Sequence, residues 1–521
     1  SFLLLTCLLY CFVKRNKGSL RFTAKSSDKV FSTPFSVIPF FFIISICFLN
    51  IYHRLLLPPL TTDGLLYHLP FAVEFFKTHN IGFVSLYFTD ISMTYYPQGG
   101  TMFYLFTLYS GMEYLYKFTQ FPFLLMGATA LYLLSKDNGF PKVLSACLFC
   151  IFALMKPVIK ESFLIYVDLI MASSFLVALY CFSSTKKKYI PLGFLAATLL
   201  ISTKNFVLIY LLPLIPCFFF KKEGRLSRKL ILSSLLFFIC IGCFTYIRNM
   251  VVTGNPMFPA EISIGDVRIF HGMFSYKKGT FINAINIIVN LWIKPMSDVD
   301  PVKYLSFILF LSLLLSIPMA FIKDRKIFYI LLIVPASIIL YLLVIPPVYY
   351  QIRHLLPIYG ILSLSLIYPF KHLKKYQFIA FIFPGIFLIE NLMFLRLIVQ
   401  CIFLSVILFL LFLFWVKKGK YIQGFIFPSV MLLLLLGWKL ILTYDIYPEI
   451  RYGICKICYG KQGELWEFAQ KNSAEPKNIA YVGEFFLYPF YGVNYKNNVF
   501  YQSVNSVDTL PIHKYERGAT K

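Results

Sequence analysis

The sequence predicts an all-α polytopic membrane protein, and two observations carry that prediction. Hydrophobic residues make up 59% of the 521-residue chain, and apolar runs close to the length of a membrane-spanning helix, about 20 residues, recur along most of it. Lys and Arg gather in every second connection between these runs, which is the charge pattern of cytoplasmic loops. We therefore expect about 12–14 transmembrane helices.

The predicted spans are distributed over most of the chain. Two of them, 189–203 and 206–220, are each short for a full span. The chain opens on Ser1 inside an apolar run, so we interpret the first span as cut short and assign no signal peptide. In chain order the segments are 1–13, 36–57, 115–135, 143–159, 165–183, 189–203, 206–220, 230–247, 304–322, 327–345, 354–370, 376–394, 397–416 and 424–443.

The formal net charge of +26 is explained by topology rather than by nucleic-acid binding. Seven short connections hold 25 Lys/Arg and only 4 Asp/Glu. Because every second connection is basic, these seven mark the cytoplasmic face, and we expect no nucleic-acid partner. The seven are 14–29, 136–142, 184–188, 221–229, 323–326, 371–375 and 417–420.

The opposite connections define the outer face. Two loops, 58–114 and 248–303, connect parts of a transmembrane body at 1–443, and a tail at 444–521 forms a small outer domain. The first loop is acidic, since it has one Lys against four Asp/Glu. Its stretches 65–78 and 101–117 are apolar with charges interspersed, a composition typical of helices that lie in the membrane interface.

The tail predicts a mixed α/β fold. A helical stretch from Glu464 to Asn472 is followed by two short strand-like runs, 479–482 and 499–501. The turn Tyr488-Pro489-Phe490-Tyr491-Gly492 lies between them.

The first candidate site lies just after the predicted span 36–57. Asp63, Tyr67 and His68 fall within six residues, and polar groups this close to lipid are kept mainly where they do chemistry or line a polar cavity. Tyr67 and His68 follow Asp63 by one helical turn, so all three can face one cleft. The structural alternative is that Asp63 caps the helix that follows it.

Four further charged residues are predicted on the same outer face. Asp168 begins the predicted span 165–183, and the structural alternative pairs it with Lys156 or Lys160. Lys204 lies at an outer turn, against the positive-inside rule, where a lone Lys can also snorkel to the interface. Arg248 and Arg353 lie at similar depth, and an Arg fork suits a phosphate. Together these residues predict an acid/base centre beside a phosphate-binding site.

The order of these motifs resembles the bacterial GT-C glycosyltransferases, and is similar to the protein mannosyltransferase and aminoarabinose transferase group. The resemblance covers most of the chain. The matching motifs are Asp63 with Tyr67-His68-Leu69-Pro70, Tyr96-Pro97, Tyr166-Val167-Asp168, Thr203-Lys204-Asn205, Arg248-Asn249 with Gly254-Asn255-Pro256, Arg353-His354-Leu355-Leu356-Pro357 and Tyr488-Pro489-Phe490-Tyr491-Gly492.

The resemblance implies an inverting transfer of a sugar from a polyprenyl-phosphate donor. Asp63 matches the base that acts on the acceptor hydroxyl, and Asp168 matches the second acid of the site. Lys204 and Arg353 match the groups that hold the donor phosphate. The site would face the periplasm from a bacterial cytoplasmic membrane.

The resemblance does not decide whether the protein uses a metal cofactor, but it narrows the chemical class of the acceptor. Some relatives use a divalent metal and others do not; His68 and Asp63 are the candidate ligands here, and no other cofactor is expected. The first loop lacks an adjacent acidic pair such as Asp-Glu, which favours a glycan or lipid acceptor over protein.

Two other functions fit an outer-face site. A polysaccharide polymerase or O-antigen-ligase-like enzyme would depend on arginines and a histidine of a late outer loop rather than on Asp63. A transporter or flippase of lipid-linked sugars would show repeated halves and broken helices at the membrane midplane. This chain gathers its polar groups at one face instead.

Overall fold

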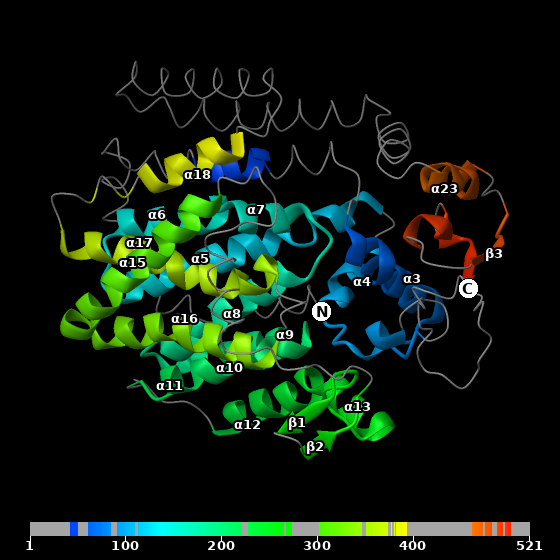
Figure 1. Cartoon of the computed structure of the whole chain (residues 1–521), viewed down its shortest axis with the longest axis horizontal. Coiled ribbons are helices and arrows are strands. Elements are labelled where there is room, and N and C mark those ends of the chain that lie inside the picture. Colours follow the sequence, from blue (N-terminus) through cyan, green and yellow to red (C-terminus); the bar gives the residue numbers. More distant parts are fainter. Residues whose placement is uncertain are drawn as a thin grey trace.

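Helices dominate the structure of the chain, which is a computed structural model, and this confirms the predicted helical class (Figure 1). Only two small sheets accompany them among the described residues. The structure describes residues 42–49, 61–84, 91–109, 113–220, 228–264, 267–272, 302–345, 351–373, 377, 380, 382–392, 461–471, 475–481, 487–492 and 495–501.

The centre of the body is α8 (Asp168–Ser183), whose residues are all buried except Val177. Helix α8 packs against α5 (Phe121–Asp137), α9 (Ile190–Ile201) and α17 (Leu356–His372). A helix that is apolar on every side must be surrounded by others, and α8 is so placed. Further helices of the body among the described residues are α6 (Lys142–Leu154), α7 (Lys156–Phe163), α10 (Leu208–Leu211), α11 (Ile215–Phe218), α12 (Arg228–Phe237), α13 (Phe244–Thr253), α15 (Val302–Lys323), α16 (Arg325–Val344) and α18 (Ile382–Leu392).

Some helices of this body are long enough to span a membrane. Within the described ranges, two helical segments, Leu115–Asp137 and Arg325–Val344, are long and apolar enough to cross a membrane. The number rises to four if two bent pairs each count as one span, namely α6 with α7 and α12 (extended to Gly242) with α13. The predicted spans 1–13, 397–416 and 424–443 lie outside the described residues, and the larger number of spans stays a prediction.

The first outer loop folds into helices at both predicted places. A π-helical turn, Gly64–His68, leads into α3 (Leu69–Thr78), which packs against α4 (Thr101–Tyr109). Pro70 lies in the first turn of α3. Because Pro lacks an N–H and its ring clashes with the carbonyl four residues earlier, the chain widens just before it into a π turn.

The tail forms the predicted α/β unit. Helix α23 (Lys461–Lys471) lies beside a parallel pair, β3 (Asn478–Tyr481) and β4 (Asn498–Tyr501), with a short helical turn at Tyr488–Tyr491. This unit lies next to α3 and α4 (Figure 1).

Three hydrogen bonds join the tail unit to α3, one of them from Lys77 Nζ to Asn498 Oδ1 at 2.7 Å. Tyr491 Oη donates to Glu74 Oε1 at 2.7 Å, and Lys77 Nζ donates to the carbonyl of Asn497 at 2.7 Å. The first loop and the tail, far apart in the sequence, therefore form one face of the protein.

The second predicted outer loop, 248–303, begins inside α13, which extends to Thr253. Gly254 has a φ of 72°, the left-handed conformation that closes a helix and that glycine adopts without strain. An antiparallel hairpin follows, β1 (Ile262–Ile264) and β2 (Val267–Phe270), which the sequence did not predict. Residues 265–266 and 273–301 of this loop, and residues 444–460, lie outside the described residues.

Candidate functional site

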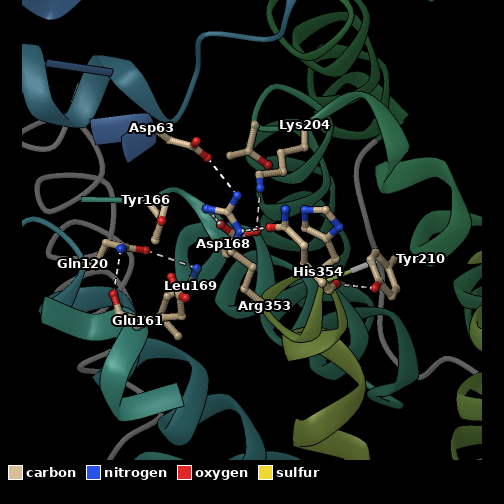
Figure 2. A network of polar contacts seen from close by, with 12 residues as sticks. Asp63, Gln120, Glu161, Tyr166, Asp168, Leu169, Lys204, Tyr210, Arg353 and His354 are labelled. Atoms are coloured by element: carbon tan, nitrogen blue, oxygen red, sulfur yellow. Dashed lines mark hydrogen bonds and ion pairs between the residues drawn. The ribbon is translucent and has the colours of Figure 1, made fainter. Parts of the chain in front are cut away.

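Four charged side chains from separate segments meet at the end of the helical body (Figure 2). Arg353 Nη2 lies 2.9 Å from Asp63 Oδ2, and its Nη1 lies 3.9 Å from Asp168 Oδ2. Lys204 Nζ lies 2.6 Å from Asp168 Oδ1. We call Asp63, Asp168, Lys204 and Arg353 the charge network. The sequence singled out all four, and the structure brings them together.

Asp168 is the anchor of the network. Its side chain is fully buried. Asp168 is also the first residue of α8, where the positive end of the helix dipole favours a carboxylate. Its close partner is Lys204 rather than the sequence neighbours Lys156 or Lys160, so the local pairing proposed as an alternative is not what forms. Lys204 is accordingly paired in the site and does not snorkel freely to an interface.

Arg353 bridges the two acids. It lies in the short turn Ile352–Leu355 before α17, and its guanidinium stacks 4.0 Å from the ring centroid of Tyr166. Burial acts to lower the pKa of Arg353, but the carboxylates of Asp168 and Asp63 more than offset it and raise that pKa above its ordinary value. Arg353 is therefore a permanent cation.

The neighbouring His354 fixes this turn through hydrogen bonds to two tyrosines. Its carbonyl accepts a hydrogen bond from Tyr210, and Nδ1 lies 3.1 Å from Tyr341 Oη. Both tyrosines are fully buried and come from α10 and α16. The backbone that carries Arg353 is thus held by two further helices.

Asp63 is the most accessible member of the network. Its side chain is 24% exposed, against 16% for Arg353, 14% for Lys204 and none for Asp168. It precedes the π turn, but its side chain makes no capping hydrogen bond. The capping role considered from the sequence is therefore absent, and the carboxylate faces Arg353 instead.

Tyr67 and His68 line the same region, with ring centroids 4.2 Å apart. Burial, reinforced by the Asp63 carboxylate, raises the pKa of Tyr67 well above its usual value. Burial lowers the pKa of His68 to about 3, although the Asp63 carboxylate acts the other way. His68 Nδ1 lies 3.0 Å from Thr101 Oγ1. Both side chains are consequently neutral near pH 7.

Two glycines allow the first loop to approach the network. The N–H of Gly99 donates to the carbonyl of Ser202 at 2.8 Å. A Cβ on Gly100 would lie 2.7 Å from the Cβ of Val167, and one on Gly99 would lie 2.7 Å from the Ser202 carbonyl. Any larger side chain would push the loop away from the segments that carry Asp168 and Lys204.

Further hydrogen bonds fix the connection between α7 and α8. Tyr104 Oη donates to the carbonyl of Tyr166 at 2.6 Å. Gln120 Nε2 donates to the carbonyls of Glu161 and Leu164, each at 2.7 Å, and Gln120 Oε1 accepts from the N–H of Leu169 at 3.1 Å. These contacts set the backbone on both sides of Asp168.

Arg248 makes different contacts from those expected. Its Nη2 donates to the carbonyl of Thr94 at 2.7 Å, and its guanidinium lies 4.2 Å from the ring centroid of Phe83. Among the described residues it forms no ion pair with the charge network. Arg248 instead holds the first outer loop against α13.

Sequence reasoning missed Glu161, Gln120 and Tyr166 as members of the site. Glu161 is 6% exposed, and its Oε2 has no hydrogen-bond partner among the described residues. Asp168 Oδ2 and Arg353 Nη1 are likewise buried, and neither has a hydrogen-bond partner there. The signal that could have identified Glu161 is an acid within a mostly apolar stretch.

The resemblance left metal dependence open, with Asp63 and His68 as the candidate ligands. Within the described ranges, no three His, Cys, Asp or Glu side chains are grouped so that they could hold a metal ion. Asp63 contacts Arg353, and His68 lies against Thr101, so neither is arranged as a ligand in this conformation.

Comparison with known proteins adds no homologue: no protein-family model, curated protein or solved structure matches this chain. The functional argument therefore depends on the chemistry of the charge network. That network offers a partly exposed carboxylate beside two cations whose positions a buried carboxylate fixes. Such a set can accept a proton and stabilise an anion at neighbouring points.

Proposed function

We propose that the chain is a membrane glycosyltransferase that moves a sugar from a polyprenyl-phosphate donor to an envelope glycan or lipid acceptor. The observation that carries the proposal is the charge network. Asp63, Asp168, Lys204 and Arg353 come from four segments up to 290 positions apart, yet their charged atoms lie within one set of contacts of 2.6–3.9 Å. Charged clusters of this kind are costly to bury, and function is the usual reason to keep one.

The proposed reaction is a single inverting displacement. Asp63, at the accessible edge of the network, removes the proton from the acceptor hydroxyl. A bond forms between that oxygen and the anomeric carbon of the sugar. The bond from this carbon to the phosphate oxygen breaks, and its electron pair leaves with the polyprenyl phosphate. Lys204 and Arg353 stabilise the departing phosphate charge.

Asp168 has a positioning role in this scheme. It is fully buried, so it is not accessible to an acceptor. Its two oxygens face Lys204 and Arg353 at 2.6 and 3.9 Å and hold both cations at fixed places. Preorganised charges of this kind stabilise a transition state without having to reorient during the reaction.

A polyprenyl carrier is embedded in a membrane, so an enzyme that uses it must be in contact with that membrane. Two to four helices among the described residues are long and apolar enough to cross a bilayer. The basic loops, such as 184–188 and 371–375, belong to the side opposite the charge network. We therefore propose a multi-pass protein of a bacterial cytoplasmic membrane whose site faces the periplasm.

The direct test is donor consumption. Purified protein is incubated with a panel of polyprenyl-phosphate sugars and crude envelope lipid or glycan, and free polyprenyl phosphate is measured. Release from one donor, with sugar appearing on an acceptor, supports the transferase. Chain extension or ligation of an already lipid-linked glycan would favour the polymerase or ligase. Movement of labelled lipid across vesicles without product would favour the transporter.

A further inference from the structure

A third carboxyl group lies beside the charge network and has no cation of its own. Glu161, on α7, is 6% exposed. Among the described residues no Lys, Arg or His nitrogen lies within ion-pairing distance of it, and its Oε2 has no hydrogen-bond partner. Figure 2 shows it next to Gln120, which fixes its backbone carbonyl at 2.7 Å.

The neighbours of Glu161 determine which charge it can carry. Asp168, Arg353, Lys204 and the adjacent Lys160 all interact with it electrostatically. Of these, Lys204 and Arg353 are already in contact with Asp168, and Arg353 also contacts Asp63. Two cations thus face two carboxylates at ion-pair distance. The remaining cation, Lys160, is exposed and forms no ion pair with Glu161 among the described residues.

An unpaired carboxylate at this depth would be unstable. Burying an ionised carboxylate without a counter-ion costs far more than keeping the acid protonated, so such a group takes up a proton instead. The neutral form also keeps the network at zero net charge, with Asp63 and Asp168 balanced by Lys204 and Arg353. A third negative charge would oppose the binding of any anionic group there.

We propose that Glu161 is a protonated acid in the folded protein and that its proton sets the charge of the site so that a phosphate-bearing ligand can bind. The second half of this inference rests on the proposed function. Loss of the Glu161 proton would add one negative charge beside Arg353 and weaken phosphate binding. Glu161→Gln, which has the same shape and no ionisable proton, would keep the neutral state at every pH.

Infrared difference spectroscopy tests the protonation without any substrate. The wild type is expected to show the carbonyl-stretch band of a buried carboxylic acid, shifted by exchange into D₂O when the site opens, and Glu161→Gln is expected to lack it. The matched control is Glu74→Gln, since Glu74 lies on α3, where it accepts from Tyr491 outside the network. The control should keep the band. A wild type without the band would overturn the proposal.

Ligand binding tests the charge-setting role. Affinity for a polyprenyl phosphate in detergent is measured from about pH 6 to about pH 9, a range in which buried carboxyls are known to titrate. We expect affinity to fall about tenfold for wild type and Glu74→Gln, and distinctly less for Glu161→Gln. Equal falls in all three proteins would overturn this role. Absence of binding at any pH, with the band present, would overturn the glycosyltransferase and leave the protonated Glu161 established.

Discussion

Two ion-pair clusters at opposite ends of the helical body differ in how completely their polar atoms are used. At the end that carries the basic loops, Lys371 Nζ contacts Asp324 Oδ2 at 2.9 Å and the carbonyl of Asn138 at 2.7 Å. Asp324 Oδ1 also accepts from the N–H of Ile327 and so caps α16. Lys371 further lies 5.1 Å from the ring centroid of Phe140.

At the other end, the charge network contains an acid that lies deeper than either member of the Lys371 pair, and its polar atoms are less completely hydrogen-bonded. Asp168 is fully buried, whereas Lys371 and Asp324 are 17% and 20% exposed. Asp168 Oδ2 and Arg353 Nη1 lack hydrogen-bond partners among the described residues, and neither member of the Lys371 pair has a buried orphan atom. A cluster whose polar atoms all find partners within the protein needs no function beyond stabilising the fold. One that is buried and unsatisfied has capacity left for a ligand.

The largest difference between the two clusters is expected from substitution of Arg353. Arg353→Lys keeps the charge but loses the planar fork that reaches Asp63 and Asp168 and stacks on Tyr166. We expect transfer to fall about 10²–10³-fold, the range for loss of one transition-state donor. The matched variant Lys371→Arg should leave the rate of transfer unchanged. Equal rates in the two variants would remove the distinction between the clusters.

The next largest effect is expected on stability, where the first loop packs closely against the segment that carries Asp168. Gly100→Ala would place a methyl group 2.7 Å from the Cβ of Val167, and overpacking of this kind costs about 1–3 kcal/mol of unfolding free energy. The control is Gly385→Ala in α18, because a Cβ there meets nothing within 4 Å. Thermal unfolding in detergent should show a lower Tm for Gly100→Ala and an equal or higher Tm for Gly385→Ala. The opposite ranking would contradict the packing.

His68 predicts a smaller, pH-dependent effect. Its pKa falls from 6.5 to about 3 on folding, so the unfolded chain binds more protons between these values and stability is lost as the pH falls through them. From about pH 7 to about pH 5 we expect a loss of about 1–2 kcal/mol. His68→Gln should lose less over this range, and the exposed-site variant His79→Gln should behave as wild type. Parallel curves for all three proteins would contradict the burial of a neutral His68.

Much of the site could be predicted because charged residues stand out against an apolar chain. Asp63, Asp168, Lys204 and Arg353 each interrupt or border a hydrophobic run at the ends without basic loops, so the pattern predicted that they lie at the same end of the body. What the pattern could not supply was partner choice. Asp168 pairs with Lys204, 36 positions away, rather than with Lys160, because that choice depends on how α8 and α9 pack.

Other features were missed for related reasons. Arg248 looks equivalent to Arg353 in sequence, but the direction of its side chain depends on α13, which turns it toward Thr94 and Phe83. Glu161 was not singled out from the sequence, and only the packing of α7 shows that it is buried. The hairpin of β1 and β2 has mostly exposed side chains on β2 and therefore lacks the alternation that reveals a strand.

The measurement that tests the central claim most directly is the transfer rate of Asp63→Asn beside Asp324→Asn, each with the wild-type donor and acceptor and each checked for folding. The network account predicts that Asp63→Asn lowers the rate about 10²–10⁴-fold, as expected for loss of a general base. It predicts that Asp324→Asn transfers sugar at the wild-type rate. Full transfer by a folded Asp63→Asn protein would contradict the account, because the charge network would then be structural like the cluster opposite it.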